Sequence, residues 1–187
     1  MPHPSNATEN GDKSPLVSKL PNLFEIIRRK EGHEALSAAL NQYYKFIPVA
    51  ALREDPHAGR YTLLHIACYF DDAESAEILL EWAKQQNSNL FEWVNVLSQK
   101  RGEEFAPLHL AAFRGNITLV RLLMSNMAVA EIRTPQGLTV LHIAAQGDEC
   151  AVLHFFVREY ELNLHDRDFH GSTPLHWACF AGSENAL

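Results

Sequence analysis

A short block recurs four times in this chain, and the recurrence constrains the fold more than any other feature. Each copy carries a Leu-His pair followed by an apolar residue and an Ala. The four histidines are His65, His109, His142 and His176, and successive copies lie 44, 33 and 34 residues apart. Repetition at a period of roughly 20–50 residues is typical of arrays in which one structural unit stacks on the next.

A second apolar element follows the block in each of the first three copies. It begins 13 residues after the histidine, as Ile78-Leu79-Leu80, Leu122-Leu123-Met124 and Phe155-Phe156-Val157. Small Ala or Cys residues in the block allow two helices to approach closely, and the triplet supplies the buried face of the second helix. The pattern therefore predicts a pair of helices in each repeat.

This pattern resembles the ankyrin repeat, a β-turn followed by two antiparallel helices with a period of about 33 residues. The resemblance covers roughly residues 20–187. It implies an all-α ankyrin-repeat solenoid of stacked helix pairs with β-turn or hairpin connections. Ala106, Leu63 and Val140 depart from the Thr or Pro that the family prefers, and Asp71 and Asp148 replace the Gly that usually ends the first helix. We expect these departures to alter single turns only.

The chain divides into three parts on this interpretation. Residues 1–18 are polar and rich in Pro, Ser and Asn, which predicts a disordered tail. Residues 19–58 carry two short apolar stripes, which predicts an N-terminal capping helix pair. The repeats then occupy about 59–101 with an insertion, 102–134, 135–168 and a truncated 169–187.

Two irregularities interrupt the array. About eleven extra residues fall within Glu81–Glu104, where the apolar segment Asn89–Leu97 is able to extend a helix or to pack over the array. We favour a lengthened second helix with a longer loop over an insertion that binds a partner. The chain also stops at Leu187, before the second helix of the last repeat, so we expect a fragment of a longer protein or a truncated gene product.

Charge and cysteine content exclude several classes of function. The net charge is −7, and the densest basic patch, Arg28–Lys30, is followed at once by Glu31. We therefore expect no nucleic-acid binding and no membrane contact by this segment. Three widely spaced cysteines indicate a reducing compartment and a cytoplasmic location, although the parent protein is free to be membrane-anchored.

The motif histidines have a structural role on this interpretation. Packed neighbouring helices lie about 8–10 Å apart, whereas zinc needs nitrogen ligands at about 2.0–2.1 Å. Histidines from adjacent repeats therefore cannot share one ion, and the turn segment His165–His170 is composed of ordinary turn residues. The resemblance implies that Thr and His in the motif hydrogen-bond locally. The structural motif residues are Thr62, His65, His109, Thr139, His142, Thr173 and His176.

No catalytic constellation, metal site or cofactor site emerges from the sequence. The chain has no Gly-x-Ser-x-Gly, phosphate-binding Gly-rich loop or Cys-x-x-Cys pattern. Cys68 and Cys179 occupy the small-residue position of the block, so we expect both thiols to be buried and inert. We therefore expect no enzyme activity in this chain.

A partner protein is expected on the concave face of the array. The resemblance implies that positions −7, −6, −4, +4 and +5 relative to each motif histidine point into this face. Seven of these twenty positions are aromatic, against 10% of the whole chain, and aromatic residues and Arg dominate interface hot spots. The candidate contacts are Tyr61, Tyr69, Phe70, Phe105, Phe113, Arg114, Gln136, Gln146, Phe169, His170 and Phe180. The alternative is that some of these rings pack between repeats.

The favoured function is thus a protein–protein interaction module whose partner is unidentified. A second hypothesis rests on His170–Cys179, which is similar to the late repeats in the ankyrin portion of Asp-His-His-Cys-type palmitoyltransferases. In that family the array recruits substrates, and the chemistry lies elsewhere. An ankyrin-bearing ion channel is a third hypothesis.

Overall fold

The computed structural model describes residues 22–29, 32–44, 52–53, 60–86, 89–100, 102 and 104–186. The predicted tail, 1–18, and the predicted boundary between residues 58 and 59 lie outside these ranges. Within them the chain forms ten α-helices and no β-strand. The helices are α1 (Leu23–Arg29), α2 (His33–Tyr43), α3 (Leu63–Tyr69), α4 (Ala73–Gln85), α5 (Leu90–Asn95), α6 (Pro107–Arg114), α7 (Ile117–Ser125), α8 (Val140–Gln146), α9 (Cys150–Glu159) and α10 (Pro174–Ala181).

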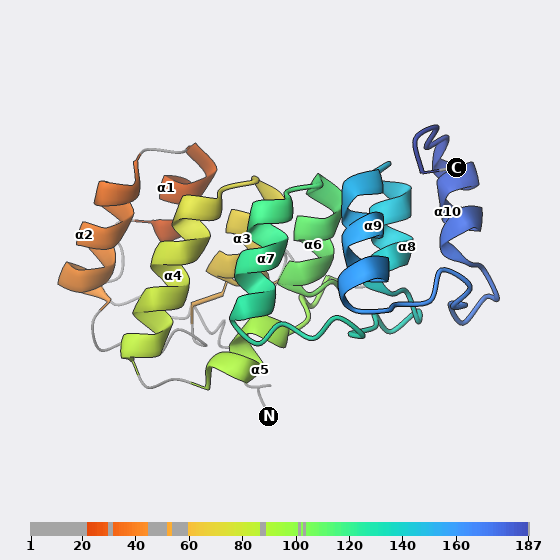
Figure 1. Cartoon of the computed structure of the whole chain (residues 1–187). Coiled ribbons are helices and arrows are strands. Elements are labelled where there is room, and N and C mark those ends of the chain that lie inside the picture. Colours follow the sequence, from red (N-terminus) through yellow and green to blue (C-terminus); the bar gives the residue numbers. More distant parts are fainter. Residues whose placement is uncertain are drawn as a thin grey trace, which may run out of the picture.

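The helices form two parallel layers, which Figure 1 shows side by side. One layer contains α1, α3, α6, α8 and α10, each packed on the next. The other layer contains α2, α4, α7 and α9 in the same order. We call these the inner and outer layers. The predicted all-α solenoid of stacked helix pairs is confirmed.

Residues at the helix starts explain why the helices begin where they do. The side chains of Asp72, Asn89 and Asn116 accept hydrogen bonds from backbone N–H groups in the first turns of α4, α5 and α7. Pro107 and Pro174 begin α6 and α10, where a missing N–H costs nothing. Local side-chain chemistry thus separates each helix from the turn before it.

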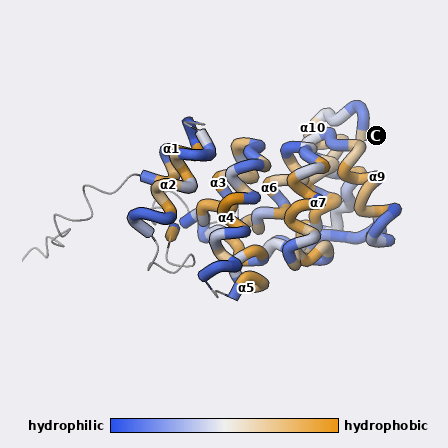
Figure 2. The backbone as a smooth tube through the Cα atoms, turned by 60° about the vertical axis from the view of Figure 1, so that its left-hand side comes forward, coloured by the Kyte–Doolittle hydropathy of each residue, from blue (hydrophilic) through white to orange (hydrophobic). Residues whose placement is uncertain are grey.

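The core lies between the two layers and is continuous along the array. The block leucines Leu64, Leu108 and Leu141 are completely buried or nearly so, and the block alanines beside them are also buried. The outer layer contributes Leu79, Leu123, Phe156 and their neighbours from the apolar triplets. Figure 2 shows hydrophobic segments on the helices of both layers and hydrophilic segments in many of the turns that join them.

The insertion both lengthens an outer helix and adds a new one. α4 has 13 residues, against 9 in α7 and 10 in α9, as favoured from the sequence. Farther along the insertion, Leu90–Asn95 form the separate helix α5, in which Trp93 and Val94 are buried. Asn95 fixes α5 to the loop after α7, because its side chain donates to the Met127 carbonyl and accepts from the Val129 N–H, both at 2.8 Å. The apolar segment therefore packs against the array.

Asp71 and Asp148 keep the turn that Gly makes in the other repeats. Their φ angles are 58° and 63°, close to the 73° of both Gly115 and Gly182. Aspartate tolerates this left-handed region better than most residues. Asp71 accepts a 2.7 Å hydrogen bond from the Asn116 side chain, so the substitution adds a contact to the next repeat.

The last inner helix differs from its predecessors, and one expectation was wrong here. Cys68 is buried as predicted, but Cys179 at the equivalent position is exposed. Leu175 is 54% exposed, whereas the equivalent Leu64 is 0% exposed. α10 lies at the end of the row (Figure 1), and the face that the next repeat covers in α3, α6 and α8 is open. Burial at this position depends on the neighbouring repeat rather than on the block itself.

Candidate functional site

Each motif histidine closes the start of its inner helix. The backbone N–H of the residue three positions earlier donates to the histidine Nδ1 at 3.1–3.2 Å in all four copies. Where that residue is Thr, its hydroxyl oxygen lies 2.7–2.8 Å from the same nitrogen. Ala106 provides no hydroxyl in the second copy. The predicted local hydrogen bonding of the Thr and His residues is therefore present.

Two of these histidines also join one repeat to the next. His65 Nε2 donates to the Phe105 carbonyl at 2.9 Å, and His142 Nε2 donates to the Ser172 carbonyl at 3.1 Å. Since Nδ1 accepts an N–H, the ring proton is on Nε2, which makes it the donor. His65, His109 and His142 are fully buried, and His176 on the last helix is exposed.

Burial keeps these rings neutral. It lowers the pKa of His65 to about 3 and that of His109 to about 4, and it also lowers the pKa of His142. A neutral ring at physiological pH retains one acceptor and one donor, which the two bonds above require. His65 and His142 are thus inter-repeat connectors, whereas the buried His109 Nε2 has no hydrogen-bond partner within the described residues.

The loops before α8 and α10 form hairpins on the same side of the array as the inner helices. Thr134 and Asp168 each close a hairpin through a backbone N–H bond, to Leu138 at 3.0 Å and Ser172 at 2.9 Å. The Phe169 N–H donates to the Gln136 carbonyl at 3.0 Å, which joins the two hairpins. Gln136 also donates from its side chain to Glu104 at 3.2 Å.

A groove of about 360 Å³ runs along the inner layer beside these hairpins. Four successive repeats contribute to it, from Tyr61, two residues before α3, to Trp177 on α10. None of its lining residues is charged, although 21% of the chain is charged. We call it the inner groove. Its lining residues are Tyr61, Tyr69, Gly102, Phe105, Leu110, Phe113, Leu138, Ile143, Gln146 and Trp177.

A second hollow of about 400 Å³ continues the inner groove past Trp177, which lines both. Its other lining residues are Asp168, His170, Ser172, His176 and Phe180. The Asp168 carboxylate accepts N–H bonds from His170, Ser172 and the Trp177 indole at 2.8–2.9 Å. Burial alone would raise the pKa of Asp168, but these bonds outweigh it and lower the pKa. The only carboxylate in the hollow is therefore already satisfied.

The structure brings seven of the predicted contact residues to these two hollows. Tyr61, Tyr69, Phe105, Phe113 and Gln146 line the first, and His170 and Phe180 line the second. The alternative that some rings pack between repeats also applies, because Tyr61 and Phe105 are half-buried against the core.

Four predicted contact residues line neither hollow. Phe70 packs half-buried against the core and meets the Tyr69 ring edge-on at 5.3 Å. Arg114 is exposed at the end of α6, and Gln136 is half-buried beside Glu104. Phe169 is 74% exposed at a hairpin tip.

The position directly after each motif histidine was not among the predicted contacts. Leu110, Ile143 and Trp177 occupy it and form part of the inner-groove wall. A signal was present, since Ile, Leu, Ile and Trp vary here between the constant His and Ala.

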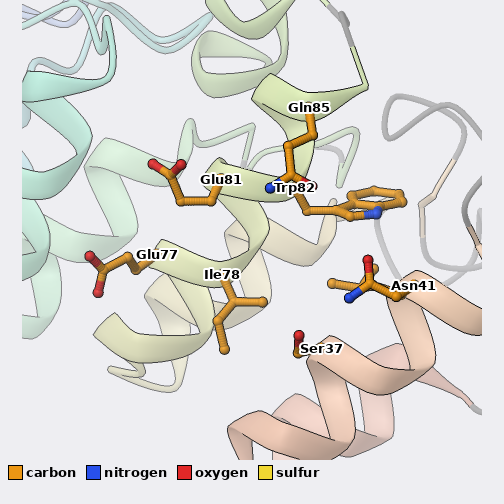
Figure 3. Close-up of a pocket in the computed structure, with 8 residues that line it drawn as sticks. Ser37, Asn41, Glu77, Ile78, Glu81, Trp82 and Gln85 are labelled. Carbon is orange, nitrogen blue, oxygen red and sulfur yellow. The ribbon is translucent and has the colours of Figure 1, made fainter.

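A third hollow, of about 300 Å³, lies in the outer layer between α2 and α4. Figure 3 shows Ile78 and Trp82 projecting toward α2, whereas Glu77 and Glu81 point away from it. Trp82 is only 6% exposed. Since the carboxylates do not converge on this hollow, it offers less recognition chemistry than the inner groove.

Neither a metal cluster nor a membrane span is found in the described part of the chain. No three His, Cys, Asp or Glu side chains there lie close enough to hold a metal ion. None of the described helices has the length and apolar character needed to cross a bilayer. Burial raises the pKa of the Cys68 thiol, which opposes formation of the reactive thiolate.

Comparison with known proteins agrees with the helix-pair architecture. The family model for ankyrin repeats (3 copies) matches residues 83–166 and 108–187, which together span more than half of the chain. The chain belongs to the ankyrin-repeat family. The ankyrin repeats thus include all the inner helices from α6 to α10 that line the groove.

Relatives of this ankyrin-repeat chain include alpha-latrotoxins of Latrodectus species and an ankyrin repeat domain-containing protein of Stachybotrys chartarum. Alpha-latrotoxin-Lh1a of Latrodectus hasselti is 35% identical over 89 residues, which cover 47% of this chain and 7% of the toxin. Alpha-latrotoxin-Lt1a of Latrodectus tredecimguttatus is 34% identical over 87 residues, covering 46% of this chain and 6% of the toxin. Ankyrin repeat domain-containing protein SAT10 of Stachybotrys chartarum is 29% identical over 120 residues, covering 63% of this chain and 6% of that protein. The chain thus spans about 6–7% of the length of these relatives.

Proposed function

We propose that this chain is a protein-interaction module that binds a partner protein along the concave face of its ankyrin array, in the inner groove. The observation that supports this most strongly is the groove's lining. Five of its ten lining residues are aromatic, and none is charged. Buried aromatic anchors surrounded by uncharged contacts are typical of the centre of a protein interface.

Exposure of the rings adds to this argument. Tyr69 is 51% exposed, Phe113 38% and Phe180 84%. These residues occupy the same repeat position, four after the motif histidine, on α3, α6 and α10. Aromatic side chains that gather on one exposed face usually mark a binding surface.

Affinity capture with the full chain as bait tests the proposal. The double variant Phe113→Ala/Phe180→Ala is compared with wild type and with Phe91→Ala. Phe91 is 52% exposed on α5 and lines neither hollow, so it is a matched control. We expect a partner that is retained by wild type and Phe91→Ala and lost by the double variant. Retention by all three proteins would contradict binding in the groove.

A further inference from the structure

The inner groove and the second hollow, which share Trp177, together form a repeating grid rather than a single pocket. Each repeat contributes the positions four before and four after its motif histidine, and the last three repeats also contribute the position one after it. The first of these columns is Tyr61, Phe105, Leu138 and Ser172, and the last is Tyr69, Phe113, Gln146 and Phe180. All eight residues line one of the two connected hollows. A ligand that lies along the groove therefore meets the same kind of site once per repeat.

The spacing of the grid matches one backbone conformation well. Adjacent inner helices pack directly on each other, and packed helices lie about 8–10 Å apart. A polyproline II chain has three residues per turn and rises about 3.1 Å per residue, which gives about 9 Å per turn. Every third side chain of such a ligand faces the same way and advances by one repeat. A β-strand alternates its side chains with a period of two, so it does not keep this register.

Polar groups in the groove also favour an extended ligand over a helix. The Tyr69 hydroxyl and the Gln146 side-chain amide make no hydrogen bond within the described residues, and both belong to the last column of the grid. A polyproline II backbone has no internal hydrogen bonds, so its carbonyl groups need donors of this kind. A helix satisfies its own backbone, and with its side chains it is about 10–12 Å across. A helix would therefore leave these two donors without backbone acceptors.

Charge excludes the remaining peptide classes. The first hollow has no charged lining residue, and the Asp168 carboxylate in the second is occupied by three N–H donors. An acidic or basic peptide would lose its hydration without gaining an ion pair. We therefore propose that the inner groove binds an uncharged, proline-rich segment of a partner protein in the polyproline II conformation, with one proline or other apolar side chain per repeat. This inference rests on the proposed function.

A peptide panel tests the inference with the full chain. One acetylated and amidated ten-residue peptide carries proline at every third position and serine and glutamine elsewhere. The second has the same composition with the prolines shuffled out of register, and the third is an uncharged amphipathic helix. Binding is measured by calorimetry and by the change in intrinsic tryptophan fluorescence, to which Trp177 in the hollows contributes together with Trp82 and Trp93. We expect the period-three peptide to bind about tenfold more tightly than the shuffled one.

Exposed positions provide variants that leave the core intact. Tyr69→Ala and Phe180→Ala are expected to weaken the period-three peptide about tenfold each, the loss typical of an interface anchor. Tyr69→Phe tests the hydroxyl donor and is expected to weaken binding by a smaller factor. Phe91→Ala is expected to bind like wild type.

The outcomes separate this inference from the proposed function. Equal affinity for the in-register and shuffled peptides, or no binding of either, would overturn the polyproline assignment. Groove-dependent binding of the helical peptide alone would also overturn it, while supporting a protein-binding groove. The capture experiment tests the proposed function separately. The proposed function fails if the double variant Phe113→Ala/Phe180→Ala retains the partner as well as wild type does.

Discussion

His65 donates from Nε2 to the carbonyl oxygen of Phe105, 40 residues later in the sequence, at a distance of 2.9 Å. The same ring accepts the Thr62 N–H on its other nitrogen at 3.1 Å. One side chain therefore fixes the start of its own helix and the position of the next repeat. Phe105 also lines the inner groove, so this bond connects the stability of the array to the shape of the proposed binding surface.

Removing this connector is expected to cost more than removing its counterpart at the end of the array. His65→Ala leaves the Thr62 N–H and the Phe105 carbonyl without this partner, and we expect it to lower the free energy of unfolding by about 2–4 kcal/mol. His176→Ala removes a similar local bond, but the ring is exposed. We expect a loss of about 0.5–1 kcal/mol there. Urea denaturation of both variants measures the difference, and equal losses would contradict the connector role.

Acid is expected to destabilise the array through its buried histidines. Burial lowers the pKa of His65 to about 3 and of His109 to about 4, below the ordinary value near 6.5. The unfolded chain therefore binds more protons than the folded chain at intermediate pH. Their contribution to stability is complete above pH 7 and is lost as the pH falls toward 4.

The variant His109→Gln removes one of these titrating side chains, so that its share of the acid sensitivity can be measured. Between pH 6 and pH 4.5 the variant is expected to lose less stability than wild type, by up to about 1.4 kcal/mol per pH unit. Denaturation curves at a series of pH values measure the two slopes. Parallel slopes for the two proteins would show that His109 does not contribute to acid sensitivity.

Ala106 offers a stabilising substitution. It begins the second repeat where the others have Thr, and its backbone N–H donates to His109 at 3.1 Å without an accompanying hydroxyl. Ala106→Thr is expected to raise the free energy of unfolding by about 1 kcal/mol, because Thr is a much better helix N-cap than Ala. Thermal denaturation monitored by circular dichroism checks this. A destabilised variant would show that the buried site has no space for the larger side chain.

Asp148 is expected to hold the segment after α10. Its carboxylate accepts hydrogen bonds from the Asn185 N–H at 2.8 Å, the Asn185 side chain at 2.6 Å and the Ala186 N–H at 2.9 Å. Asp148→Gly keeps the left-handed backbone and removes these acceptors. We expect faster hydrogen exchange at the Asn185 and Ala186 amides and unchanged exchange in α6. Unchanged exchange at Asn185 and Ala186 would show that other contacts hold this segment.

The sequence was sufficient for the features that one repeat determines by itself. The Thr–His cap, the buried Leu64, Leu108 and Leu141 and the order of helix pairs all follow from the block and its spacing. The differences between Cys68 and Cys179 were not predictable in the same way, because the two residues occupy equivalent positions in their blocks. Only the presence of a covering repeat distinguishes them.

The candidate site was predictable in part for a similar reason. Tyr69, Phe113 and Phe180 were expected on the binding face from their repeat position, and the structure places them along the two hollows. Ile143 and Trp177 were not predicted as contact residues, because an apolar residue between His and Ala is also typical of a core position. For α5, the sequence indicated only an apolar segment able to extend a helix or to pack over the array, because its placement depends on the Asn95 contacts with the loop after α7.

Site-specific cross-linking tests the central claim most directly. A photoreactive amino acid replaces Phe113 in the inner groove in one protein and His154, exposed on α9 of the outer layer, in another. We expect the partner retained in the capture experiment to cross-link from position 113 and not from position 154. Cross-linking from position 154 alone would place the partner on the outer layer and contradict binding in the groove.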